Sequence, residues 1–142
     1  MCERWIGLNS HAKPSEPGEI KRRKSLGRAG ENVAKAHLLR NGFRILAVNY
    51  RRSEGEADIV AIKGDLLIFC EIKTRIGSGE PREGYGKVQQ KRLAKVSEIF
   101  VHENRHLLPY EFDLRYDLVI VGKCDDGKLE VKEYIEDAIG PL

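Results

Sequence analysis

The chain has no long run of apolar residues, and this absence excludes the commonest kind of membrane protein. No hydrophobic segment approaches the roughly 20 residues that a helix needs to cross a bilayer. The first five residues also lack the apolar core of a signal peptide, so we expect no secretion and no membrane insertion. A length of 142 residues with 41% hydrophobic residues suits one domain with a modest core.

Cysteine and histidine are both scarce. The three cysteines, Cys2, Cys70 and Cys124, are odd in number and follow no metal-binding spacing, and the four histidines form no cluster. This usage argues against a disulfide framework and indicates the reducing cytoplasm. Cys70 alternates away from Glu71 along a predicted strand, so we expect it to be a small buried hydrophobic residue.

The net charge of +3 is small, but its distribution is uneven. Residues 1–29 hold seven Lys and Arg against three acids, and residues 72–95 hold seven against two. Residues 111–137 are acidic, with nine Asp and Glu against four bases. The second basic stretch begins at Lys73 and Arg75, which favours a phosphate-binding face over the alternative, an ordinary solvated surface.

Periodicity and turn residues predict an α/β fold with the order αβββαββ, in which helices flank a mixed central sheet. Residues 1–24 are polar and are predicted to form a flexible basic arm, either a phosphate-binding extension or a solubilising tail. Residues 25–142 form the domain. Its predicted elements are a helix over 26–41 closed by Gly42, strands over 43–50, 55–62 and 66–73, a glycine-rich loop over 76–86, a helix over 88–104, and strands over 115–121 and 129–135.

The second and third strands form a hairpin that brings two carboxylates together. If Gly64-Asp65 is a two-residue turn, Lys63 pairs with Leu66, and counting outward sets Asp58 opposite Glu71. Directly opposed residues have Cβ atoms about 5 Å apart. Lys73 points to the face of Glu71 because strand side chains alternate. Two carboxylates this close repel unless a proton or a cation lies between them, and carboxylate oxygens suit Mg²⁺.

A second copy of this spacing serves as a control. Asp117 precedes Glu130-Val131-Lys132 at the separation that Asp58 has from Glu71. The turn signal Asp126-Gly127 is off-centre, however, so counting outward sets Glu130 opposite Lys123 and Asp117 near Glu136. The acids of this second hairpin are therefore not expected to meet.

These residues resemble a known family, the uncharacterised bacterial YraN-like proteins, which are similar to the archaeal Holliday-junction resolvases of the PD-(D/E)XK nuclease superfamily. The resemblance runs from about Leu26 to Ala138, and Ala57 departs from the proline of the superfamily name. It implies a restriction-endonuclease-like fold. The motifs that carry it are Gly30-Glu31-Asn32, Asn41-Gly42-Phe43, Asn49-Tyr50-Arg51, Gly55-Glu56-Ala57-Asp58, Glu71-Ile72-Lys73-Thr74-Arg75, Lys91 and Arg115-Tyr116-Asp117.

The resemblance implies roles for four side chains. Asp58 and Glu71 would be metal ligands, together with the carbonyl of Ile72, and Lys73 would be the catalytic lysine. Glu31 would be the helix-borne acid beside them; from the sequence alone it is either that or a charge favoured by the helix dipole. Two further residues stay open: Glu56 either joins the metal site or is an exposed strand residue, and Gln89 either reaches the site or lies on the surface.

The expected activity is hydrolysis of DNA phosphodiesters by a Mg²⁺-dependent endonuclease, with Mn²⁺ as a substitute and branched or repair DNA among the substrates. Lys73 would orient the attacking water or stabilise the phosphorane oxyanion. A resolvase-like role would favour a symmetric homodimer. The alternative is a nucleic-acid-binding module that has the fold without catalysis. The residues expected to contact DNA are Arg75, Arg82, Lys87 and Lys91.

Overall fold

The computed structural model describes residues 17–76 and 86–138, with side chains from residue 26 onward. These residues form an α/β domain with one five-stranded sheet and two long helices, which confirms the expected class. No helix among them combines the length and apolarity that crossing a membrane requires. The elements are α2 (Pro17–Arg40), β1 (Arg44–Arg52), β2 (Gly55–Lys63), β3 (Leu66–Arg75), α3 (Lys87–Glu103), the short 3₁₀ helix η1 (Arg105–Leu107), β4 (Asp113–Lys123) and β5 (Leu129–Ile135).

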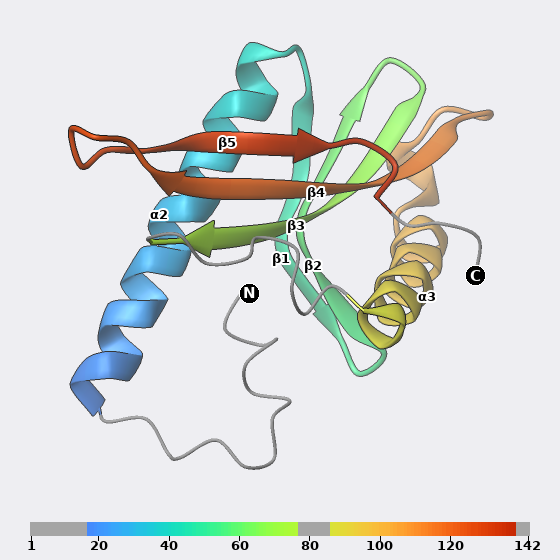
Figure 1. Ribbon diagram of the computed structural model, residues 1–142. Helices are drawn as coiled ribbons and strands as arrows, with labels where there is room; N and C mark the ends of the chain where they lie inside the picture. The colour runs from blue at the N-terminus through green and yellow to red at the C-terminus, as the bar shows by residue number, and fades with distance from the viewer. Residues whose placement is uncertain (1–16, 77–85, 139–142) are drawn as a thin grey trace.

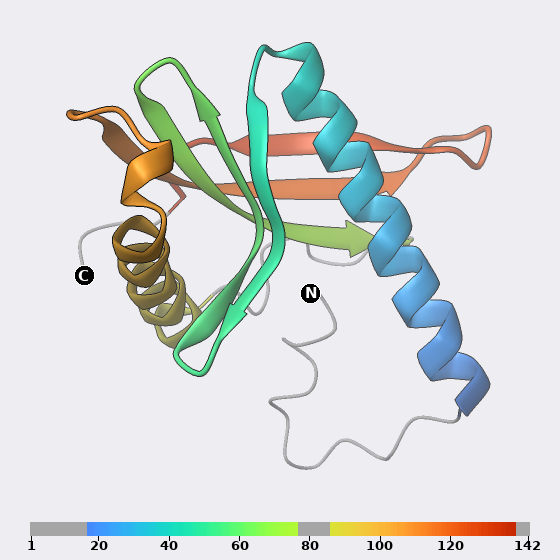
Figure 2. The ribbon, with the colours of Figure 1, turned by 180° about the vertical axis from the view of Figure 1, so that it is seen from behind.

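The sheet is mixed, and its strands lie side by side in chain order, β1-β2-β3-β4-β5. All neighbours are antiparallel except β3 and β4, which are parallel because the chain crosses over through α3 between them. Figures 1 and 2 show α2 and α3 on either side of this sheet. The three strands β1–β3 therefore form a meander, and β4 with β5 extends it beyond the crossover.

The core has two parts because alternate strand residues face opposite sides of the sheet. On the α2 side, Ala34 and Leu38 pack against a cluster that includes Ile68 and Cys70, so Cys70 is buried as expected. On the α3 side, the cluster includes Phe69 and residues of α3. The α3 members of that cluster are Leu93, Val96 and Phe100.

The helical spacing of Val88, Leu93, Val96, Ile99 and Phe100 in the sequence predicts an apolar stripe on α3. The structure differs from it at the start of the helix, where Val88 is exposed. Ser97 is fully buried instead, and it is tolerated there because its hydroxyl is hydrogen-bonded to the Ala94 carbonyl at 2.6 Å and lies 2.7 Å from the Tyr116 hydroxyl. This pair of hydroxyls joins α3 to β4.

Helix α2 starts nine residues before the expected position and ends at Arg40, one residue before the predicted end. It begins at Pro17, so residues 17–24, expected to belong to the basic arm, have helical backbone. Proline suits the first helical position and Lys, Arg and Glu are good helix formers, which explains the longer helix. At the other end Gly42 has φ of 86°, and the Phe43 N–H donates to the Leu38 carbonyl at 3.0 Å, which forms a Schellman cap.

The β2–β3 hairpin has the predicted register. Lys63 pairs with Leu66 across Gly64-Asp65, and Gly64 has the positive φ (60°) that the first central position of a type II′ turn requires. The sequence signal was sufficient here because a two-residue turn leaves only one way to pair the strands.

The β4–β5 hairpin differs from the prediction by one residue. Glu130 pairs with Gly122 rather than with Lys123, because the loop has three residues, 125–127, with Gly127 at φ of 84°. A β-bulge between Ile120 and Val121 then restores the predicted register farther along the strands. The two acids of this hairpin accordingly lie far apart, as expected.

Candidate functional site

Four ionisable side chains named from the sequence are almost completely buried. Their exposed fractions are 7% for Glu31, 1% for Asp58, 2% for Glu71 and 0% for Lys73. Buried charges are costly unless they are paired or bind an ion, so four of them in one region of a small domain are unusual. They come from three elements, α2, β2 and β3, that the fold brings together.

Asp58 lies where the backbone pairing of β2 and β3 ends; we call this point, around Asp58, Glu71 and Ile72, the fork. The ladder of backbone pairs between these strands ends at Ile59 and Cys70. Beyond this pair a side chain takes the place of a backbone acceptor: the Ile72 N–H donates a hydrogen bond of 2.8 Å to Oδ2 of Asp58. In an extended strand the N–H and C=O of one residue point to the same edge, so the Ile72 carbonyl also faces the fork. The same register, continued by one step, puts Glu71 across from Asp58.

Asn49 lies on the other side of Asp58, and the sequence reasoning gave it no role. The β1–β2 ladder continues on both sides of this position but lacks the pair between Asn49 and Asp58. Asn49 has a left-handed backbone with φ of 53°, which few residues other than glycine adopt and which interrupts the ladder. Continuing the register of both ladders places Asn49, Asp58 and Glu71 at one level across β1, β2 and β3, although neither ladder pairs them.

The Asn49 side chain connects this row to α2. Its Nδ2 donates a hydrogen bond of 3.1 Å to Oε2 of Glu31. Its Oδ1 is buried and has no hydrogen-bond partner within the described part of the chain. An orphaned buried acceptor on a strained backbone is an expensive arrangement, and such arrangements are found mainly at functional sites. The available signal was an asparagine inside a predicted strand, where asparagine is disfavoured.

Glu31 lies on α2, and its surroundings, including the charge of Asp58 at the fork, change the pKa of its carboxyl. Burial is the main cause that raises the pKa of the Glu31 carboxyl above its ordinary value of 4.5, and the charge of Asp58 raises it further. The hydrogen bond from Asn49 acts in the opposite direction and lowers the pKa. Asp58 is thus close enough for its charge to act on the Glu31 carboxyl.

The residues expected to contact DNA lie at the periphery. Arg75 ends β3 and is half-buried, whereas Lys87 and Lys91 are exposed in the first turns of α3. Arg82 lies outside the described residues. Gln89 is half-buried on the same turn of α3.

Glu56, left open by the sequence, forms an ion pair across the β1–β2 hairpin. Its Oε2 is 3.1 Å from Nε of Arg51, and its side chain is only 12% exposed. It lies two residues before Asp58, so this pair flanks the fork rather than filling it.

Comparison with known proteins decides the family. The model of the uncharacterised protein family UPF0102 matches residues 30–121, a span that begins at the helix turn carrying Glu31 and includes the whole fork. The chain belongs to this family. The predicted resemblance to the YraN-like proteins is confirmed by this match.

Several UPF0102 proteins are similar over most of their length. The one from Dictyoglomus thermophilum is 36% identical over 117 residues, which cover 81% of this chain and 97% of that protein. The one from Azorhizobium caulinodans is 36% identical over 124 residues, covering 84% and 92%. The one from an Arthrobacter species is 39% identical over 104 residues, covering 72% and 84%. The chain is thus similar to whole members of UPF0102.

The UPF0102 match begins at Gly30, and the structure explains why a side chain is absent there. A Cβ at Gly30 would lie 2.0 Å from Oγ1 and 3.2 Å from Cβ of Thr74, which is buried on β3. Helix α2 therefore approaches β3 closely just before Glu31 and just after Lys73. This contact sets the distance at which Glu31 enters the site.

Gly30→Ala is expected to destabilise the protein by about 1–3 kcal/mol, because overpacking outweighs the better helix propensity of alanine. Urea unfolding measures the change. In a Thr74→Ala background, where the clashing hydroxyl is absent, the same substitution should cost clearly less. Equal costs in both backgrounds would show that Thr74 is not the obstacle.

Glu31→Gln is expected to make the metal-free protein more stable at neutral pH. The raised pKa means that the native state disfavours ionised Glu31, so wild-type stability falls as pH rises from 4.5 through the native-state pKa. Glutamine carries no charge and avoids this loss. Urea unfolding of both proteins should give similar stabilities at pH 4 and a gain for the variant at pH 7; a gain independent of pH would contradict the assignment.

Proposed function

We propose that the protein is a metal-dependent nuclease that hydrolyses DNA phosphodiesters, with a restriction-endonuclease-like fold of the PD-(D/E)XK type. The observation that carries this proposal is the position of Asp58, at which both neighbouring strand ladders are interrupted. The β2–β3 hairpin contributes two buried carboxylates, Asp58 and Glu71, and the buried Lys73. Helix α2 contributes a third buried carboxylate, Glu31. This set supplies ligands for a hard cation and a positive charge for a phosphate.

The donor set fits Mg²⁺ better than a transition metal. Asp58, Glu71 and the Ile72 carbonyl would offer two carboxylates and one main-chain oxygen, all hard oxygen donors, and Mg²⁺ usually completes such a shell with waters and substrate phosphate. When bound, Mg²⁺, or Mn²⁺ in its place, supplies an activated water and neutralises phosphate charge.

The side chains around this centre have separate tasks. Lys73 brings a compact positive charge into a site from which water is largely excluded, where it orients the attacking water or stabilises the charge that develops on the phosphate. Asp58 is held in the fork by the Ile72 N–H, which fixes the direction of its carboxylate. Glu31 is held by Asn49 and would position water on the α2 side.

DNA would contact cations at two places that Figures 1 and 2 show well apart, the start of α3 and the end of β3. Lys87 and Lys91 are exposed at the start of α3, and Arg75 ends β3. Such cations bind the phosphate backbone without reading sequence, and their contribution weakens as salt rises. The proposed substrates therefore include branched DNA, recognised by shape.

The purified protein should be tested with Mg²⁺ or Mn²⁺ on labelled linear, single-stranded, flapped and four-way DNA. We expect cleavage of at least one substrate, abolished by EDTA. Binding without cleavage under every condition would replace the nuclease by an inactive nucleic-acid-binding module. Neither cleavage nor binding would refute both.

Asn49→Gly is expected to lower the cleavage rate about tenfold, the scale of residues that support metal ligands. Glycine accepts φ of 53°, so the fold should be retained while the hydrogen bond to Glu31 is lost. Because that bond lowers the pKa of Glu31, the acidic limb of the pH–rate profile should move to higher pH. As a control, Asn104→Gly removes an asparagine whose side chain bonds only the end of α3 and should change neither quantity. An unshifted limb would remove Asn49 from the site.

A further inference from the structure

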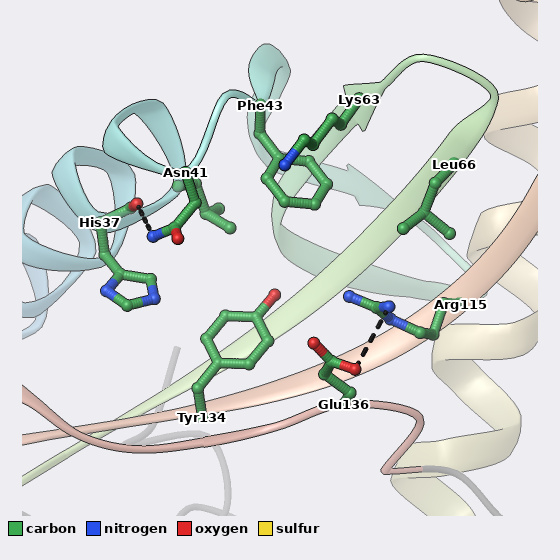
Figure 3. A pocket seen from close by; sticks show the side chains of 9 residues that line it. His37, Asn41, Phe43, Lys63, Leu66, Arg115, Tyr134 and Glu136 are labelled. Carbon is green, nitrogen blue, oxygen red and sulfur yellow. Dashed lines mark hydrogen bonds and ion pairs between the residues drawn. The ribbon is translucent and has the colours of Figure 1, made fainter.

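A polar hollow lies at the opposite end of the β2–β3 hairpin from the fork (Figure 3). Its volume is about 600 Å³, and it opens between the end of α2, the hairpin turn and the strands β4 and β5. Lys63 and Leu66 line it beside the turn, five residues from Asp58 and Glu71, or about 16 Å along each strand. The lining residues are His37, Leu38, Asn41, Phe43, Lys63, Leu66, Arg115, Tyr134 and Glu136.

One cation of this hollow is rigidly held. The Arg115 guanidinium donates two hydrogen bonds, of 2.8 and 2.9 Å, to the carboxylate of Asp117, which is completely buried. The Tyr134 hydroxyl donates to the same carboxylate at 2.5 Å. These bonds fix the guanidinium, and its remaining nitrogen Nη1 lies 3.5 Å from Glu136, whose side chain is two-thirds exposed. A ligand anion of higher charge could displace that weakly held carboxylate.

The second cation is Lys63, at the end of β2. Its ammonium lies 5.7 Å from the centre of the Phe43 ring, and no carboxylate of the described residues forms an ion pair with it. Figure 3 shows the Lys63 ammonium, the Arg115 guanidinium and the Tyr134 hydroxyl directed toward the same space. Two cations from different strands that converge on one space favour an anion with more than one negative charge.

The walls of the hollow are partly aromatic. The rings of His37 and Tyr134 are stacked with centroids 5.5 Å apart, and Phe43 lies across the hollow from them. A volume of about 600 Å³ is within the range of small-molecule sites and larger than a lone phosphate needs. The ligand that combines these properties has a planar ring and a phosphate monoester, which carries about −1.5 to −2 charges at neutral pH.

We propose that this hollow binds a nucleoside phosphate monoester, with the phosphate between Lys63 and Arg115 and the base against the rings of Phe43, His37 and Tyr134. Two sources present this chemistry, a free mononucleotide and the phosphorylated end of a nucleic-acid strand. The site does not depend on the proposed nuclease centre, since it shares no residue with it.

Isothermal titration calorimetry in EDTA, where metal-dependent cleavage cannot occur, tests this site separately from the nuclease proposal. Deoxynucleoside monophosphates should bind, and the corresponding nucleosides and inorganic phosphate should each bind at least about tenfold more weakly, since each lacks one of the two contacts. Equal binding of nucleoside and monophosphate, or no binding of any monophosphate at millimolar concentration, would overturn the proposal.

Three exposed substitutions sharpen the test. Lys63→Gln should weaken monophosphate binding about tenfold, whereas Glu136→Gln should tighten it several-fold by removing the competing carboxylate. Lys123→Gln is the matched control, because Lys123 is also an exposed lysine that ends a strand before a turn, but it does not line the hollow. Thermal melting checks that all three fold. A Lys63 variant that binds like wild type would overturn the assignment.

A single-stranded oligonucleotide with and without a 5′-phosphate separates the two sources. If the phosphate strengthens binding and Lys63→Gln cancels that gain, the hollow takes strand ends. If only free monophosphates depend on Lys63, it takes mononucleotides. Both results support the phosphate site, and dependence of neither on Lys63 would refute it.

Discussion

Lys73→Ala is expected to slow DNA cleavage at least about a hundredfold, the usual scale for a positioned catalytic group. Lys73 is fully buried next to the fork, so its charge acts where little water screens it. DNA affinity should fall only slightly, because one phosphate contact among several is lost. Single-turnover cleavage measures the rate, and electrophoretic binding at matched salt measures the affinity. Lys73→Met, which keeps the buried volume, should give the same loss of rate if charge and not packing is responsible.

Lys132→Ala is the matched control within the same chain. Lys132 follows Glu130 at the spacing that Lys73 has from Glu71, but it is exposed on the edge strand β5 and pairs with Glu130 at 2.8 Å. Its removal should leave cleavage and affinity near wild type, because exposed ion pairs contribute little. Equal losses from both lysines would mean that Lys73 acts through general charge, and a loss from Lys132 alone would move the active site to the second hairpin.

Asp58→Asn is expected to abolish metal-dependent cleavage and most of the stabilisation that Mg²⁺ gives through mass action. The amide oxygen can still accept the Ile72 N–H, so the metal-free fold should be retained. Asp58→Ala loses that acceptor as well and should cost a further 1–3 kcal/mol or so, since the Ile72 N–H is then buried without a partner. Thermal melting with and without Mg²⁺ separates the two effects.

Asp117→Asn tests whether replacing any buried aspartate would remove the stabilisation by Mg²⁺. Asp117 is as buried as Asp58 but accepts from Arg115 and Tyr134, so the variant should be less stable in EDTA. The increment in melting temperature on adding Mg²⁺ should stay that of the wild type. A loss of that increment in Asp117→Asn, or its retention in Asp58→Asn, would contradict the proposed ligand set.

The hairpin that carries the candidate site could be predicted because its geometry is local. Gly64 and Asp65 define a two-residue turn, and strand alternation follows from it, so the sequence was enough to predict the register from Lys63–Leu66 to Ile59–Cys70 and the burial of Cys70. The predicted register of the β4–β5 hairpin was wrong by one residue next to its loop. Its three-residue loop and its bulge offset each other, and neither has an unambiguous signal in the sequence.

The rest of the site depends on contacts between elements that are distant in sequence. Gly30 matters because Thr74 lies against it, and Asn49 matters because Glu31 accepts its hydrogen bond. Periodicity along one element says nothing about such contacts. The start of α2 was missed for a different reason: its first residues lack an apolar stripe, so helix propensity and Pro17 were the only signals.

The bulge between Ile120 and Val121 affects how freely this chain could change length during evolution. The bulge offsets the extra residue of the three-residue loop at 125–127, so Asp117 keeps its partners. The β2–β3 ladder is regular from the turn to the fork and contains no bulge that could offset an added residue. An insertion between Lys63 and Leu66 would shift one strand against the other and turn either Asp58 or Glu71 to the wrong face. Related chains with the same chemistry should therefore vary in length at the second hairpin and keep the first one constant.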